Sequence, residues 1–209
     1  MEKLRAGRVS ESYLNLSKKV DAEIIKAYVG LGSNLGDRAG NLLLAVRGLF
    51  EASFVVHKLS AVYETEPVGV EGHGKFLNMA AEIYLSGISP SQMLARMLRI
   101  EYLLGRKDKN LHKPRTVDLD LLMFGDLRME TPFLTLPHPQ MHLRRFVLTP
   151  LAEIAPHAVH PVSGRNIVQL LNESNDQAAV KRWNPNAKNT FENDEMKIYF
   201  KSVTQVNEN

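Results

Sequence analysis

The stretch at residues 114–124 (PRTVDLDLLMF) limits the possible fold of this chain more than any other stretch. It is dominated by Val, Leu, Met and Phe, which is typical of a β-strand. Side chains alternate between the two faces of a strand, so Asp118 and Asp120 share one face while Val117, Leu119 and Leu121 share the other. The pattern predicts a strand that buries one face and presents two carboxylates, roughly 7 Å apart, on the opposite face.

Two carboxylates this close repel each other and raise each other's pKa unless a cation neutralises them. Because the chain has no Cys and no His lies two residues away, these oxygen ligands favour Mg²⁺ or Mn²⁺ over Zn²⁺. Arg115, beside the pair, is suited to bind a phosphate through two hydrogen bonds. The local pattern is equally compatible with a solvent-exposed strand face whose acids pair with Arg or Lys from a neighbouring strand.

The composition is that of a globular protein. With 209 residues, 44% hydrophobic and 23% charged, the chain is expected to form one well-buried domain with tails. A net charge of +3 permits an anionic substrate such as a nucleotide but does not require nucleic acid. Residues 1–22 lack the apolar segment of a signal peptide, and no apolar run is long enough to span a bilayer. A cytoplasmic protein is therefore expected.

The other apolar patterns predict a series of strands and helices. In chain order these are a strand at 24–31, a helix around 42–50, strands at 54–63 and 76–85, a helix at 90–104, and the acidic strand. This order predicts an α+β fold with a ferredoxin-like β-α-β-β-α-β core, in which helices cover one face of a mainly antiparallel sheet. The predicted organisation is a peripheral extension at 1–23, a domain at 24–172 and a polar tail at 173–209.

Two of these elements have specific signals. Ser89 and Gln92 form a capping box at the start of the second helix, and Gly105 is suited to end it. In the strand that begins at Phe76, alternate residues form an apolar face, which leaves Phe76 and Asn78 on the other face. An aromatic ring beside an amide is suited to a flat, hydrogen-bonding ligand, although a purely structural Asn is equally compatible with the pattern.

After the acidic strand, a possible short strand pair leads to His138 and His142. Pro139 lies between them and the Glu of an H-E-x-x-H motif is missing, so a phosphate or ribose contact is favoured over zinc binding. Residues 147–154 are predicted to form a core helix.

Six short blocks occur in a fixed order: residues 28–37 (YVGLGSNLGD), 63–67 (YETEP), 76–78 (FLN), 105–106 (GR), 114–120 (PRTVDLD) and 137–146 (PHPQMHLRRF). The ordered set resembles the 6-hydroxymethyl-7,8-dihydropterin pyrophosphokinase family of the folate pathway, over roughly residues 25–172. Each block alone is a weak signal, but the ordered set is highly specific.

The resemblance implies an ATP-dependent pyrophosphokinase that transfers pyrophosphate from ATP to the hydroxymethyl group of the pterin and releases AMP. It implies two Mg²⁺ ions held by Asp118 and Asp120, with Arg106 and Arg115 as further catalytic residues. The residues implied on the nucleotide side are Glu101, Arg106, Arg115, His138 and Arg144. Those implied on the pterin side are Asn34, Thr65, the Val68 backbone, Phe76, Asn78 and Phe146. The expected partners are these two small molecules, without nucleic acid or membrane, and a monomer is expected.

The chain departs from the family pattern before the acidic strand, where His112-Lys113 replace a Trp-Gly pair found in many relatives. Closure of this loop over the site is therefore expected to differ. The residues alone leave two other classes open, a metal-dependent phosphohydrolase or nuclease and an RNA-binding module of the same topology. The second is disfavoured because the aromatic RNA-binding motif is missing and bare carboxylates repel phosphates.

Overall fold

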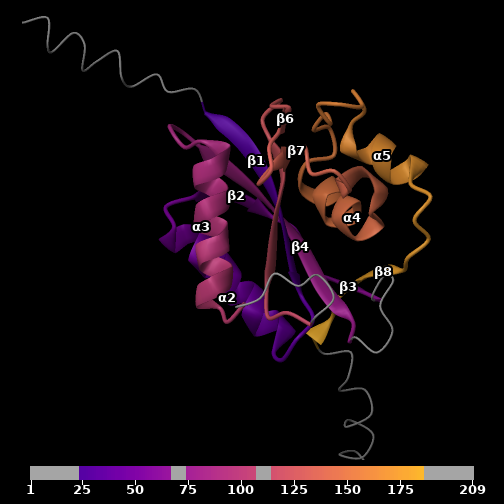
Figure 1. Ribbon diagram of the computed structural model, residues 1–209. Helices are drawn as coiled ribbons and strands as arrows, with labels where there is room; N and C mark the ends of the chain where they lie inside the picture. The colour runs from indigo at the N-terminus through magenta and orange to yellow at the C-terminus, as the bar shows by residue number, and fades with distance from the viewer. Residues whose placement is uncertain (1–23, 67–73, 107–113, 186–209) are drawn as a thin grey trace, which may run out of the picture.

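The computed structural model describes residues 24–66, 74–106 and 114–185 and is centred on a six-stranded antiparallel sheet (Figure 1). The strands follow the order β5-β1-β4-β3-β8, and β2 also pairs with β4. Their bounds are β1 Ile25–Ser33, β2 Val55–Leu59, β3 Tyr63–Thr65, β4 Phe76–Leu85, β5 Asp118–Phe124 and β8 Val180–Arg182. The predicted α+β class and antiparallel sheet are confirmed.

One face of the sheet is apolar and is covered by α2 (Arg38–Glu51) and α3 (Pro90–Leu103), as Figure 1 shows. Alternate residues of β1, β4 and β5, among them those of β4 and β5 predicted to point inward, form this core together with the buried faces of the two helices. The helix residues in this core are Leu42, Ala45, Leu49, Met93, Met97 and Ile100. At the end of the predicted helix Phe50 is 54% exposed, because α2 buries positions 42, 45 and 49.

The opposite face of the sheet has a helical layer of its own. Here α4 (Arg145–Ile154) and α5 (Ile167–Glu173) form a second core with Tyr28, Ala80 and Leu122, which lie on β1, β4 and β5 (Figure 1). The same face is polar two residues earlier on each strand, at Asn78 on β4 and Asp120 on β5. The ferredoxin-like core thus has its two helices on one face, while later helices cover the apolar part of the other and leave the polar part for the site.

The strand predicted at 54–63 is divided into β2 and β3, both of which pair with β4. Ser60 lies between them and makes two hydrogen bonds to Ala80. Its backbone N–H donates to the Ala80 carbonyl at 2.9 Å, and its side-chain Oγ accepts from the Ala80 N–H at 2.9 Å. The hydroxyl replaces a regular backbone partner at this point. The strand therefore continues along β4 after a local break.

The predicted capping box of α3 is confirmed. The Ser89 side chain accepts from the Gln92 N–H, the Gln92 side chain accepts from the Ser89 N–H, and Gly105 has a positive φ of 92° beyond the helix end. The predicted strand pair after β5 is also present as β6 (Met129–Glu130) and β7 (Thr135–Leu136).

The segment after α5 returns to the main sheet. β8 pairs with β3, and the partly buried Trp183 packs against the first core. The Asp176 carboxylate also accepts a hydrogen bond from the Arg145 N–H, at the start of α4. Residues 173–182, placed in the polar tail by the sequence analysis, thus contact both the sheet and α4. No helix in the described part of the chain is long and apolar enough to cross a membrane.

Candidate active site

The floor of the candidate site is formed by two glycines of β1. Gly32 lies opposite Asp118 on β5 and opposite Asn78 on β4, so these three positions form one row across the sheet. Gly30 lies opposite Asp120 in the next row on the same face. A Cβ at Gly32 would lie 3.1 Å from Asn78 Oδ1, which is tighter than ordinary packing. The missing side chains at these glycines let the Asn78, Asp118 and Leu122 side chains approach the β1 backbone, along a glycine strip between the carboxylates and the amide.

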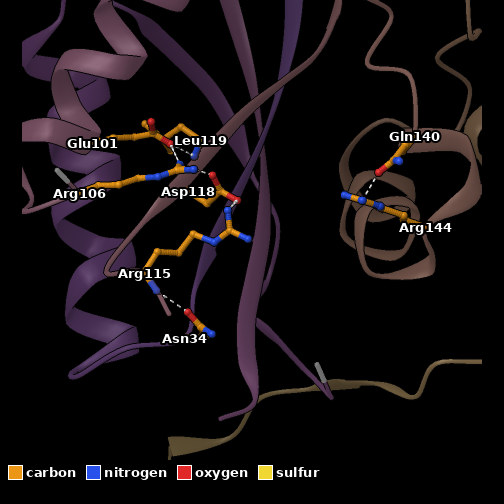
Figure 2. Close-up of polar contacts among 8 residues, drawn as sticks. All are labelled: Asn34, Glu101, Arg106, Arg115, Asp118, Leu119, Gln140 and Arg144. Atoms are coloured by element: carbon orange, nitrogen blue, oxygen red, sulfur yellow. Dashed lines mark hydrogen bonds and ion pairs between the residues drawn. The ribbon is translucent and has the colours of Figure 1, made fainter. Parts of the chain in front are cut away.

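Asp118 is held between two arginines (Figure 2). Arg106, just beyond α3, donates to Asp118 Oδ1 and also to Glu101 Oε1. Arg115 Nη1 lies 2.8 Å from the other oxygen, Asp118 Oδ2. These side chains are mostly buried, so their charges are less screened than those of a surface ion pair. Two guanidinium groups therefore converge at one point on the polar face, an arrangement suited to phosphate charge.

Glu101 ties α3 to β5 and is only 4% exposed. Its Oε1 accepts from the Leu119 N–H at 2.7 Å and from Arg106. Burial raises the pKa of Glu101, and the hydrogen bond from Leu119 and the charge of Arg106 offset this rise in part. Burial also lowers the pKa of Arg106, but Asp118 and Glu101 outweigh that effect and the net shift is upward. Glu101 thus holds the Arg106 guanidinium in place and in its charged form.

The second acid of the strand, Asp120, is the most perturbed group of the site. Its pKa is raised to about 7, first by burial and then by the charges of Asp118 and Glu101, which Arg144 and Arg115 offset only in part. The repulsion expected from the D-x-D pattern is therefore present in the folded protein. It is the setting in which a bound cation stabilises neighbouring carboxylates.

Arg115 is also fixed through its backbone. Its N–H donates to Asn34 Oδ1 at 2.8 Å, and its carbonyl accepts from the Asn34 N–H at 3.2 Å (Figure 2). The Asn34 Nδ2 group is buried and has no partner among the described residues. Asn34 thus anchors the segment before β5 and leaves an amide donor available to a ligand.

On the other side of the glycine strip, the groups are neutral. Asn78 Nδ2 donates to Thr65 Oγ1 at 2.8 Å, and both residues are almost fully buried. Phe76 lies beside Thr65 across the β3–β4 pair and shares a face with Asn78. Phe146, on α4, packs against the second core, whose Ala80 lies two residues from Asn78 on the same face. Val68 lies outside the described residues.

A third group of residues comes from the segment between β7 and α4. The His138 N–H donates to the Leu122 carbonyl at 2.8 Å, which fixes this segment beside β5. Burial, then the charge of Arg144, lowers the pKa of His138, while Asp118 acts in the opposite direction. Arg144 donates to the Gln140 side chain and lies 5.7 Å from the Phe146 ring centroid. Figure 2 shows Arg144 and Gln140 apart from the cluster around Asp118, so the structure does not join these two groups directly.

The role of Gly30 and Gly32 was not predicted. The predicted strand ended at residue 31, whereas β1 continues to Ser33, so that both glycines lie inside it and form the floor of the site. The available signal was a Gly at alternate positions of a strand, which marks close approach by a ligand or another backbone. The departure at His112-Lys113 lies outside the described residues.

An α+β sheet with paired acids and converging arginines on its polar face defines an enzyme domain built for a phosphate-bearing substrate. The family model described as 7,8-dihydro-6-hydroxymethylpterin-pyrophosphokinase (HPPK) matches residues 28–156. The chain therefore belongs to this family, the pyrophosphokinases of folate synthesis, whose substrate is a pterin.

Individual relatives agree with this assignment. The chain is 49% identical over 129 residues to the 2-amino-4-hydroxy-6-hydroxymethyldihydropteridine pyrophosphokinase of Bacillus subtilis, covering 61% of this chain and 77% of that protein. The protein of the same name from Synechocystis is 41% identical over 148 residues, covering 70% and 75%. Among solved structures, Plasmodium falciparum HPPK-DHPS aligns with a TM-score of 0.58 at 16% identity. That alignment covers 73% of this chain but only 46% of the longer one, and it supports the fold alone.

Proposed function

We propose that this chain transfers the β,γ-pyrophosphoryl group of ATP to the hydroxymethyl oxygen of 6-hydroxymethyl-7,8-dihydropterin, giving AMP and the pterin diphosphate. The observation that carries the proposal is the row Asp118–Gly32–Asn78, which places a charged group and a neutral hydrogen-bonding group on either side of the glycine strip. A phosphate chain and a flat heterocycle need these two environments side by side.

On the nucleotide side, Arg106 and Arg115 are assigned to the charge that develops on the phosphate oxygens during transfer. Both have a buried Nε without a partner among the described residues, so each keeps a donor for a ligand. Glu101 holds Arg106 in position, and Asn34 holds Arg115 through its side-chain oxygen and its backbone N–H. Preorganised donors of this kind stabilise a transition state because they need no reorientation during the reaction.

His138 and Arg144 are assigned to the same nucleotide. His138 Nδ1 accepts a hydrogen bond from the Gln140 N–H at 3.2 Å, so the neutral ring has its proton on Nε2. Its lowered pKa favours this neutral form. His138 therefore offers an N–H donor, and Arg144 a guanidinium, to the phosphate oxygens.

Asp118 and Asp120 are assigned to two Mg²⁺ ions. The residues present fit this role, because two carboxylates lie two residues apart on the polar face of β5, and burial followed by the charges of Asp118 and Glu101 raises the pKa of Asp120. No group of three or more His, Cys, Asp or Glu residues in the described ranges is arranged to hold a metal ion. The remaining ligands would thus come from ATP oxygens and water, which Mg²⁺ commonly retains. When bound, Mg²⁺ would neutralise phosphate charge and assist deprotonation of the pterin hydroxyl.

The pterin is assigned to the neutral side of the strip. Asn34, Thr65 and Asn78 provide donors and acceptors for its ring edge, and the rings of Phe76 and Phe146 are suited to pack on its faces. The Val68 backbone, outside the described residues, is assigned to the same pocket from the family resemblance.

In the proposed reaction, the pterin hydroxymethyl oxygen attacks the β-phosphorus of ATP. The bond between this phosphorus and the oxygen that bridges the α- and β-phosphates breaks, and AMP leaves with that oxygen. The hydroxyl proton passes to solvent. The protein contributes chiefly by positioning the two substrates and by stabilising charge with its arginines.

The test is to measure AMP formation from ATP by the full chain with and without the hydroxymethyl pterin, in the presence of Mg²⁺. AMP and pterin diphosphate are expected in equal amounts, and only when the pterin is present. AMP production that is unchanged when the pterin is omitted would instead identify a phosphohydrolase and overturn the proposal.

A further inference from the structure

A cavity of about 450 Å³ lies between the β6–β7 hairpin, the segment that follows β7, and residues 160–162. Part of its wall is apolar, with contributions from Met129, Leu136, Pro137, Pro139 and Val162. Among its polar lining residues are Arg128, His142 and His160, none of which the proposed pyrophosphoryl transfer uses. The cavity thus combines an apolar wall with a group of nitrogen donors and acceptors.

His160 is the strongest indication of a ligand. It is only 4% exposed, and its Nδ1 accepts a hydrogen bond from the Ser163 N–H at 3.2 Å. The neutral ring therefore has its proton on Nε2. Nε2 is fully buried and has no hydrogen-bond partner among the described residues. A buried N–H without an acceptor is destabilising, so this position calls for an acceptor from outside the described chain.

Two further groups lie beside this donor. The His142 and His160 rings meet edge to face with centroids 5.5 Å apart, and His142 Nδ1 is also buried without a partner in the described ranges. Arg128 donates to the Pro161 carbonyl, which holds its guanidinium at the cavity. Burial, with His142 and Arg128 beside it, lowers the pKa of His160 and keeps its ring neutral.

The chemistry favours an oxyanion over a metal ion. A metal at His160 Nε2 would have to displace the proton there, while Nδ1 already accepts from a backbone N–H and cannot take that proton without losing the bond. Arg128 adds a positive charge to the same wall. The carboxylate among the lining residues is that of Glu130, which is exposed. A ligand with an anionic oxygen satisfies both the buried N–H and the guanidinium.

We propose that this cavity is a second ligand site, which binds the oxyanion of a small molecule through His160 Nε2–H and Arg128, with the apolar wall against the rest of the molecule. His138 also lines the cavity, so the occupant would lie next to the proposed nucleotide site. The shared chemistry of the ligand is a phosphate or a carboxylate group.

The experiment uses the full chain labelled with ¹⁵N in its His rings, with ring signals recorded by NMR while inorganic phosphate or benzoate is added. We expect saturable shifts of the His160 and His142 signals with at least one probe. The exposed His157, three residues from His160, provides an internal reference whose signal should stay in place. Tighter binding of phosphate or of benzoate would distinguish a phosphate ligand from a carboxylate on an apolar body.

Three variants sharpen the result. His160→Phe should abolish the shift of the His142 signal, Arg128→Gln should weaken binding about tenfold, and His157→Gln should behave as the parent chain. The proposal is overturned if neither probe moves the His160 and His142 signals, or if both probes bind the first two variants as tightly as the parent. If His160→Phe does not fold, the affinity of Arg128→Gln for the two probes tests the proposal, because Arg128 lies on the surface and its replacement should leave the fold intact. The readout does not depend on pyrophosphoryl transfer, so the two proposals fail separately.

Discussion

On the β5 side of the site, Asp118 is held by ion pairs to Arg106 and Arg115, whereas on the β3 side a neutral hydrogen bond joins Thr65 to Asn78. Under the proposed function, the charged side would exchange partners when a phosphate chain or a cation binds, because the same arginines and carboxylate would contact the ligand. The neutral side would keep its internal bond and only add contacts. The comparison leads us to expect that charge on one side controls the chemical step, while preorganised polar groups on the other control recognition.

The largest effect is expected from the charged side. Asp118→Ala and Asp120→Ala should each reduce AMP formation roughly a thousandfold, because loss of charge stabilisation by several kcal/mol corresponds to about three orders of magnitude in rate. The measurement is turnover at saturating substrates over a range of Mg²⁺ concentrations, with circular dichroism to verify the fold. Asp126→Ala, an exposed acid just beyond β5, serves as the matched control. Near-normal turnover in either site variant would refute the two-metal assignment.

An intermediate effect is expected from the neutral side. Asn78→Ala removes the proposed pterin contact and leaves the buried Thr65 hydroxyl without its donor, at a cost of about 1–3 kcal/mol. The KM for the pterin should therefore rise about 10- to 100-fold, while kcat and the KM for ATP change little. Steady-state kinetics with each substrate varied in turn measures this, and the exposed Asn172→Ala is the control. A fall in kcat with an unchanged pterin KM would contradict the division of roles.

The smallest effect is expected from the segment that supports the neutral side. Arg144, the residue before α4, makes no side-chain cap, and the Asp176 carboxylate instead accepts from the Arg145 N–H at 2.7 Å. Asp176→Ala should lower stability by about 1 kcal/mol and raise the pterin KM a few-fold, since α4 carries Phe146. Thermal unfolding and pterin kinetics measure the two effects.

Asp176→Asn is the matched variant, because an amide oxygen can still accept the hydrogen bond. It should recover most of both losses. If it resembles Asp176→Ala in pterin KM, or if Asp176→Ala loses stability without any change in KM, the supporting role is wrong.

Much of the local structure follows from the sequence because it depends on neighbouring residues. The alternation of Asp118 and Asp120 with apolar residues determined which face of β5 is polar, and the Ser89–Gln92 capping box marked the start of α3. Both patterns depend on backbone geometry over a few residues, which the chain specifies locally. The ordered motifs also identified the family, which the family match confirms.

Only the tertiary structure decided how distant residues meet. Glu101 reaches the Leu119 N–H from another element, Gly32 separates Asp118 from Asn78 through strand register, and β8 returns to β3 from the end of the described chain. No local pattern contains these relations, because they depend on strand pairing and helix packing between segments far apart in the sequence. The acids and the two arginines were therefore predictable as site residues, but the ion pairs of both arginines with Asp118 and the glycine floor beside it became visible only in the folded chain.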